Sequence, residues 1–156
     1  MPDINTYGSG QCQKFYGDVL FYEYCTIPES DVIQAGAKRY YSGGMGSPFL
    51  HDIASCLMPD FGSVVFSALA FALYTNPQRI YLVGCDCSDL GYFDRDQPGV
   101  SPSLEHNMHR VLEGWSEFKK FAAHFYPDIE IISINPVGLK GMFKDVSATG
   151  VVSNLE

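Results

Sequence analysis

No apolar run in the 156-residue sequence approaches the ~20 residues that a membrane-spanning helix needs. Its first ten residues, MPDINTYGSG, contain neither the basic nor the apolar segment of a secretory signal peptide. Basic side chains are also scarce, because 10 Lys and Arg stand against 18 Asp and Glu and give a net charge of −8. This balance argues against nucleic acid, or an anionic membrane surface, as the main partner.

A disulfide framework is missing as well. The five cysteines are an odd number without framework spacing, which favours free thiols in a reducing compartment and predicts a cytoplasmic protein. Cys85 and Cys87 could share a metal ion, but no second Cys or His pair with zinc spacing accompanies them. The glycine-rich stretch from Tyr40 to Pro48 lacks the Lys-Ser/Thr ending of a P-loop and is expected to be a surface loop. We therefore expect no metal site and no cofactor.

The most regular part of the sequence is the stretch from Phe61 to Asp94. Within it, residues 64–74 are almost uncharged and rich in Ala, Leu and Phe, which predicts a buried helix that ends before Asn76-Pro77. Residues 80–83 are apolar and are bounded by Gly84, which predicts a strand. A buried helix followed by an apolar strand is the repeating unit of a parallel α/β sheet. Ligands of such sheets bind beyond the carboxyl ends of the strands, which here means residues 84–94.

The remaining elements predict one α/β domain. A helix should begin at Ser103 and a strand should cover residues 129–134, followed by a turn at 135–138 and one helical turn at 139–143. In the less regular front part, residues 1–60, we expect a strand at 15–24, one or two helical turns within 27–38 and a short helix at 51–58. The predicted fold is a small or truncated three-layer α/β/α Rossmann-like arrangement with a mainly parallel sheet, a nucleotide-binding-like core at 61–146 and a polar tail at 147–156.

Three segments are expected to converge at the carboxyl edge of the strands, residues 86–94, 106–109 and 135–138, and the start of the buried helix is a further candidate site. Gly62 and Ser63 begin the buried helix, where free backbone amides and the helix dipole favour an anion such as phosphate, although Ser63 could equally be a plain helix cap. Asp86 ends the strand and could bind a ribose hydroxyl, bind a metal ion, or close its own loop with a hydrogen bond. His106 and His109 share one helix face at spacing i, i+3 and are candidates for a general base, although exposed helix histidines are more often simple polar surface.

The run GSVVFSALAFALYTNPQRIYLVGCD, residues 62–86, resembles a segment shared by two related groups of proteins. One group is the bacterial CMP-sialic-acid-dependent sialyltransferases, and the other contains 6-hydroxymethylpterin diphosphokinase-like enzymes and motility accessory proteins. The likeness to the sialyltransferases continues through Tyr92-Phe93-Asp94, the two histidines and the closing run IEIISINPVGLKGMF, and it covers roughly residues 61–143.

This resemblance implies a metal-independent glycosyltransferase of polysaccharide biosynthesis. It would transfer sialic acid or a related sugar from a nucleotide-sugar donor, such as a CMP-sugar, to a glycan acceptor. By the resemblance, His106, or alternatively His109, takes the proton of the acceptor hydroxyl, and Tyr92 supports the departing phosphate. The predicted nucleotide-binding residues are Gly62, Ser63, Gly84, Asp86, Ser88, Tyr92, Asn135, Pro136 and Gly138. Among them, the resemblance implies roles for Ser63, with its adjacent amides, and for Tyr92.

The sequence departs from the transferase pattern in two places. Ser88 stands where those enzymes carry a second tyrosine, and their Gly/Asn-rich nucleotide loop has no counterpart in residues 1–60. Two alternatives therefore stay open: a diphosphokinase-like enzyme that uses ATP and Mg²⁺ on a pterin-type alcohol, and a non-catalytic nucleotide-binding module. A lipid-linked acceptor would bring the protein to a membrane surface, and self-association into a homo-oligomer is also open.

Overall fold

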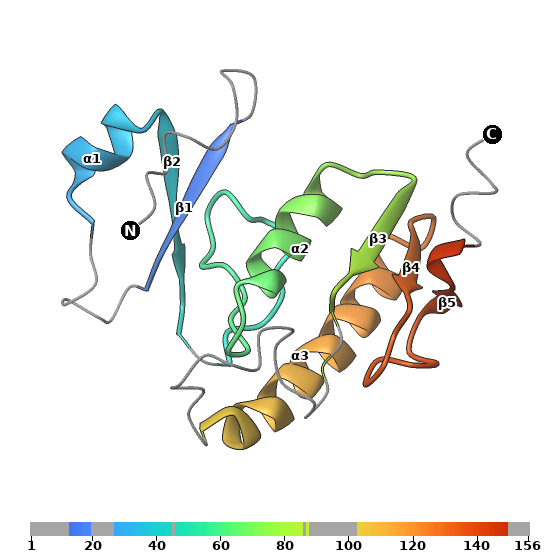
Figure 1. Ribbon diagram of the computed structural model, residues 1–156. Helices are drawn as coiled ribbons and strands as arrows, with labels where there is room; N and C mark the ends of the chain where they lie inside the picture. Colours follow the sequence, from blue (N-terminus) through green and yellow to red (C-terminus); the bar gives the residue numbers. More distant parts are fainter. Residues whose placement is uncertain (1–12, 20–26, 45, 86, 88–102, 150–156) are drawn as a thin grey trace.

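The computed structural model describes residues 13–19, 27–44, 46–85, 87 and 103–149, with the backbone alone at 19 and 103–107 (Figure 1). In this part of the chain the fold is mixed α/β, with parallel strands throughout. The first sheet pairs β1 (Lys14–Val19) with β2 (Ala37–Ser42), and the second has the order β3 (Arg79–Val83), β4 (Glu130–Ile134), β5 (Lys144–Val146). The helices are α1 (Glu29–Gln34), α2 (Val65–Tyr74) and α3 (Ser103–Phe125).

The β1–β2 pair has a helix on each of its two faces. Tyr40 of β2 and Phe15 of β1 contact Phe71 of α2, with ring centroids 5.4 and 4.5 Å apart. Arg39, the neighbour of Tyr40, hydrogen-bonds Glu29 of α1. Since successive side chains of a strand point to opposite faces, α1 and α2 cover opposite faces of this pair.

Helix α2 also faces the second sheet, so it lies between the two sheets (Figure 1). The buried core combines Leu69 and Leu73 of α2 with Ile80 and Leu82 of β3. From α3 it takes side chains spaced three and four residues apart, as one face of a helix requires: Trp115, Phe118 and Ala122.

The direction of α2 places its start at the carboxyl end of its neighbouring strands. Only residues 75–78 connect α2 to β3, and only residues 126–129 connect α3 to β4, so each helix runs opposite to the strand that follows it. The carboxyl end of β3 therefore points toward the end of the molecule where α2 and α3 begin, and Figure 1 shows β1 and β2 ending on the same, lower side. A ligand of this fold is expected at that end.

The predictions for the central part of the chain are confirmed. The helix predicted at residues 64–74 is α2, the strand predicted at 80–83 is β3 with one more residue, and the strand predicted at 129–134 is β4. Helix α3 begins at Ser103, as predicted. The α/β class and the parallel strands are likewise confirmed, although the described strands form two sheets.

Two predictions for other parts of the chain were wrong, and one strand was missed. Residues 40–42, expected in a loop, belong to β2, and residues 51–58 form turns in which the Asp52 carboxylate accepts the amides of Ala54 and Ser55. The chain bonds into the first sheet at Met58 instead, where its amide donates to the Tyr41 carbonyl at 2.8 Å. Strand β5 was not predicted at all.

The other expectations hold in part. The helical turns expected within residues 27–38 are present as α1, which ends at Gln34. In place of the helical turn expected at 139–143, the chain makes two successive hydrogen-bonded turns. The strand expected at 15–24 is present as far as Val19, and residues 20–24 lie outside the described part. No helix among the described residues combines the length and apolar character that crossing a bilayer requires.

Candidate functional site

A hollow of about 390 Å³ lies where the start of α2 meets the β1–β2 pair, and we call it the α2 hollow. This volume falls within the range of pockets that hold small molecules. The hollow is at the same end of the molecule as the carboxyl ends of β1 and β2. Its lining residues are Gly17, Tyr40, Asp60, Gly62, Ser63, Val64 and Ser67.

One wall of the hollow is the turn that leads into α2. Gly62 has φ +80°, a left-handed conformation that favours glycine, and its amide donates to Oδ1 of Asp60 at 2.8 Å. The hydroxyl of Ser63 accepts the amide of Val65 at 3.4 Å, and the buried hydroxyl of Ser67 donates to the Pro59 carbonyl at 3.1 Å. These bonds fix the turn against the helix that it begins.

The opposite wall comes from the β1–β2 pair. Gly17 and Tyr40 are direct partners in the parallel register, and the Tyr40 ring lies across the Gly17 backbone. A Cβ atom at residue 17 would lie 2.4 Å from the Tyr40 hydroxyl oxygen and 2.5 Å from its Cζ, so a larger side chain would displace the ring. Phe71 of α2 also contacts the Tyr40 ring edge-on. The position of Tyr40 on this wall therefore depends on glycine at residue 17.

The two walls offer complementary chemistry. The first amides of α2 and its dipole favour negative charge at the Ser63–Val64 end, although the Gly62 amide is already taken by Asp60. Asp60 itself supplies an ionised carboxylate, which can only accept hydrogen bonds. Tyr40 supplies a hydroxyl that can donate or accept. The hollow can thus hold a ligand that carries both an anionic group and hydroxyl groups.

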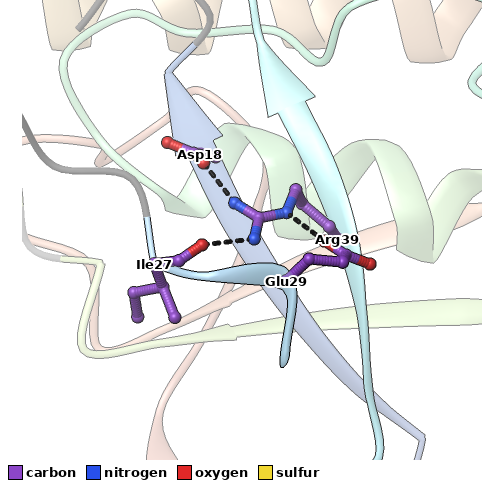
Figure 2. Close-up of polar contacts among 4 residues, drawn as sticks. All are labelled: Asp18, Ile27, Glu29 and Arg39. Carbon is purple, nitrogen blue, oxygen red and sulfur yellow. Dashed lines mark hydrogen bonds and ion pairs between the residues drawn. The ribbon is translucent and has the colours of Figure 1, made fainter. Parts of the chain in front are cut away.

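Behind the β1–β2 wall lies a charged cluster around Arg39, on the α1 face of the pair. The guanidinium pairs with Asp18, donates to the Ile27 carbonyl and donates to Glu29 at 3.0 Å (Figure 2). The Arg39 and Asp18 side chains are only 8% and 3% exposed. Burial by itself would lower the pKa of Arg39, but the hydrogen bonds with Glu29 and Asp18 outweigh it and raise that pKa above its usual value. Arg39 thus ties β1, α1 and β2 together behind the hollow.

Replacing Arg39 by leucine is expected to lower the melting temperature strongly, because Asp18 then keeps a buried carboxylate without its guanidinium partner. The matched control is Arg79→Leu, which removes an ion pair with Glu130 whose arginine is 59% exposed. We expect the loss at Arg39 to be on the order of three times the loss at Arg79, measured by thermal unfolding followed by circular dichroism. Equal losses would show that the buried cluster is no more important than an exposed pair.

The predicted nucleotide residues fall into separate groups. Gly62 and Ser63 line the α2 hollow. Gly84, with φ +68°, turns the chain after β3. Asn135 follows β4, donates its amide to the Val146 carbonyl and accepts the Ala148 amide on Oδ1, so it joins β4 to the end of β5. Pro136 and Gly138 follow Asn135 in the same turn. The lining of the hollow includes none of these four predicted residues: Gly84, Asn135, Pro136 and Gly138.

Other predicted residues are described in part or lie outside the described residues. Asp86, Ser88 and Tyr92 lie outside them, and for His106 only the backbone, in the first turns of α3, is described. The side chain of His109 is exposed. In the described part of the chain, no group of three or more His, Cys, Asp or Glu side chains is placed to hold a metal ion.

Five lining residues were not predicted as site residues: Gly17, Tyr40, Asp60, Val64 and Ser67. Two of them carry a sequence signal. Gly17 is an isolated glycine inside a strand pattern, which often marks a close approach of another group, and Asp60 stands two residues before Gly62, as in side-chain-capped turns. No sequence signal assigns Tyr40 or Ser67 to the hollow.

The chain was compared with protein-family models, with curated proteins and with solved structures, and none of the three comparisons found a match.

Proposed function

We propose that the protein is a glycosyltransferase that takes a sugar from a nucleotide-sugar donor, and that the α2 hollow binds the nucleotide. The observation that carries this proposal is the place of the hollow. It is lined by Gly17 and Tyr40 in the carboxyl-terminal halves of two parallel strands, and by Gly62 and Ser63 at the start of a buried helix. The resemblance of residues 62–86 to the sialyltransferases supports the same site. The complete fold would then be Rossmann-like and three-layered.

The proposed chemistry needs no metal ion. A histidine takes the proton of the acceptor hydroxyl, whose oxygen attacks the anomeric carbon while the bond from that carbon to the phosphate oxygen breaks. The departing nucleotide keeps the bond electrons as negative charge on phosphate. Backbone amides at the start of α2 and the Tyr92 hydroxyl would stabilise this charge, as preorganised hydrogen-bond donors can.

Calorimetric titration with CMP, CDP, UDP and ATP, each with and without Mg²⁺, tests the proposal. We expect CMP to bind in the absence of metal, because the site relies on backbone amides and side-chain hydrogen bonds. Binding of ATP alone, and only with Mg²⁺, would favour the diphosphokinase alternative. Absence of binding for all four nucleotides would contradict a nucleotide site.

The histidine role is tested with the single variants His106→Ala and His109→Ala. We expect His106→Ala to slow sugar transfer at least about tenfold with nucleotide affinity nearly intact, because a general base acts on the acceptor and not on the donor. His109, whose side chain is exposed on the same helix, is the alternative base and is tested in parallel. A slowing confined to His109→Ala would assign the base to that residue, and unchanged rates in both variants would remove the histidines from the mechanism.

A further inference from the structure

Asp60 gives the α2 hollow an acceptor that a pure phosphate site would not contain. Its carboxylate accepts the Gly62 amide at 2.8 Å. Its backbone carbonyl accepts the Gly46 amide, and its backbone amide donates to the Ser47 carbonyl. A fixed carboxylate repels phosphate and attracts hydroxyl or amino donors. The part of a ligand that lies against Asp60 is therefore a hydrogen-bond donor.

Tyr40 reaches the same hollow from the other wall. Its hydroxyl lies above Gly17, and its ring is held edge-on by Phe71. Among the described residues the Tyr40 hydroxyl has no hydrogen-bond partner, while the carboxylate of Asp60 bonds only its own turn. A polyol between the two walls could donate to Asp60 and exchange a hydrogen bond with Tyr40.

We infer that the α2 hollow recognises the ribose of the nucleotide, with Asp60 accepting from the ribose hydroxyls and the Tyr40 hydroxyl facing them. This inference rests on the proposed function and adds that the nucleotide site is specific for ribose over deoxyribose. The phosphate then lies toward Ser63 and Val64, where the helix dipole favours its charge, and away from the Asp60 carboxylate. A carboxylate that binds ribose hydroxyls near a phosphate-binding helix start is an arrangement that α/β proteins use for nucleotides.

The test compares the binding of CMP with that of 2′-deoxy-CMP by calorimetry. We expect the wild-type protein to bind CMP about tenfold more tightly, because the deoxynucleotide leaves a charged acceptor without one of its donors. The Asp60→Asn variant keeps a carbonyl oxygen for the Gly62 amide but loses the charge. In this variant the preference for CMP over 2′-deoxy-CMP should fall to about threefold or less. Tyr40→Phe, which keeps the ring over Gly17, should weaken CMP binding severalfold.

Asp52→Asn is the matched control. Asp52 also accepts two backbone amides in a turn, from Ala54 and Ser55, but it does not line the hollow. We expect this variant to keep the wild-type preference for CMP. Equal affinities of the wild-type protein for CMP and 2′-deoxy-CMP, or an unchanged preference in Asp60→Asn, would overturn the ribose assignment and leave the nucleotide site standing. Failure of the wild-type protein to bind either nucleotide would overturn both.

Discussion

Replacing Phe66 by alanine is expected to lower the free energy of unfolding by about 3–5 kcal/mol, the usual loss for a large aromatic side chain deleted from a core. Phe66 is completely buried on α2. Its ring centroid lies 5.4 Å from those of Phe61 and Trp115 and 6.2 Å from that of Phe49. Phe66 therefore joins the turn before α2, the loop after β2 and helix α3, and none of these three can close the space that alanine would leave without moving the other two.

Urea unfolding, followed by circular dichroism at equal protein concentrations, measures this loss. Tyr74→Ala on the same helix is the matched control, because Tyr74 is 57% exposed and its removal should cost less than about 1 kcal/mol. The two variants delete aromatic rings of similar size from one helix, so their difference reports burial. A loss at Phe66 no larger than the loss at Tyr74 would mean that the aromatic cluster is not the centre of the core.

The central part of the fold could be predicted because its signals are local. The apolar run of α2 ends at Asn76-Pro77, and the spacing of Trp115, Phe118 and Ala122 marks one face of a helix. These patterns identify a helix from neighbouring residues alone. Strand β4 is apolar over its whole length except for Glu130 and Ser133, which is the pattern of a buried parallel strand.

The front of the fold depends on contacts between distant residues, which a single sequence does not display. The end of β2 was mistaken for a loop because Gly43, Gly44 and Gly46 follow it closely. What makes residues 40–42 a strand is their pairing with β1, where Tyr40 lies opposite Gly17. Strand β5 has only three residues, Lys-Asp-Val, and no periodicity, so nothing but its pairing with β4 defines it.

The same difference between local signals and long-range contacts explains which residues of the candidate site could be predicted. Gly62 and Ser63 could be predicted, because a glycine-serine turn at the start of an apolar helix is a local signal. Tyr40 could not be predicted, since its place in the hollow follows from the register of β1 and β2 and from the contact with Phe71. The Gly62-Ser63 turn of one wall was therefore visible in the sequence, and the place of Tyr40 on the other wall required the sheet.

Replacing Gly114 by alanine is expected to destabilise the protein by about 2 kcal/mol, although alanine is the better helix former by about 1 kcal/mol. Gly114 lies on α3 where that helix meets α2 and the turn before it. A Cβ atom there would lie 2.5 Å from Cζ of Phe66, 2.6 Å from Cβ of Phe61 and 2.7 Å from Cγ of Phe61. The Phe66 contact involves the far end of a side chain, but the Phe61 contacts lie next to the backbone and can be relieved only by moving the turn.

A double-mutant cycle measures this steric conflict. Gly114→Ala, Phe66→Leu and the double variant are unfolded in urea, with the exposed neighbour Glu113→Ala as a control that should change the free energy of unfolding by less than about 0.5 kcal/mol. Because leucine lacks the far end of the Phe66 ring, we expect the double variant to be more stable than the sum of the two losses predicts. Part of the loss should remain, since Phe61 is unchanged. A Gly114→Ala variant more stable than the wild-type protein would mean that helix propensity decides this position and that α2 and α3 do not pack as closely as the distances require.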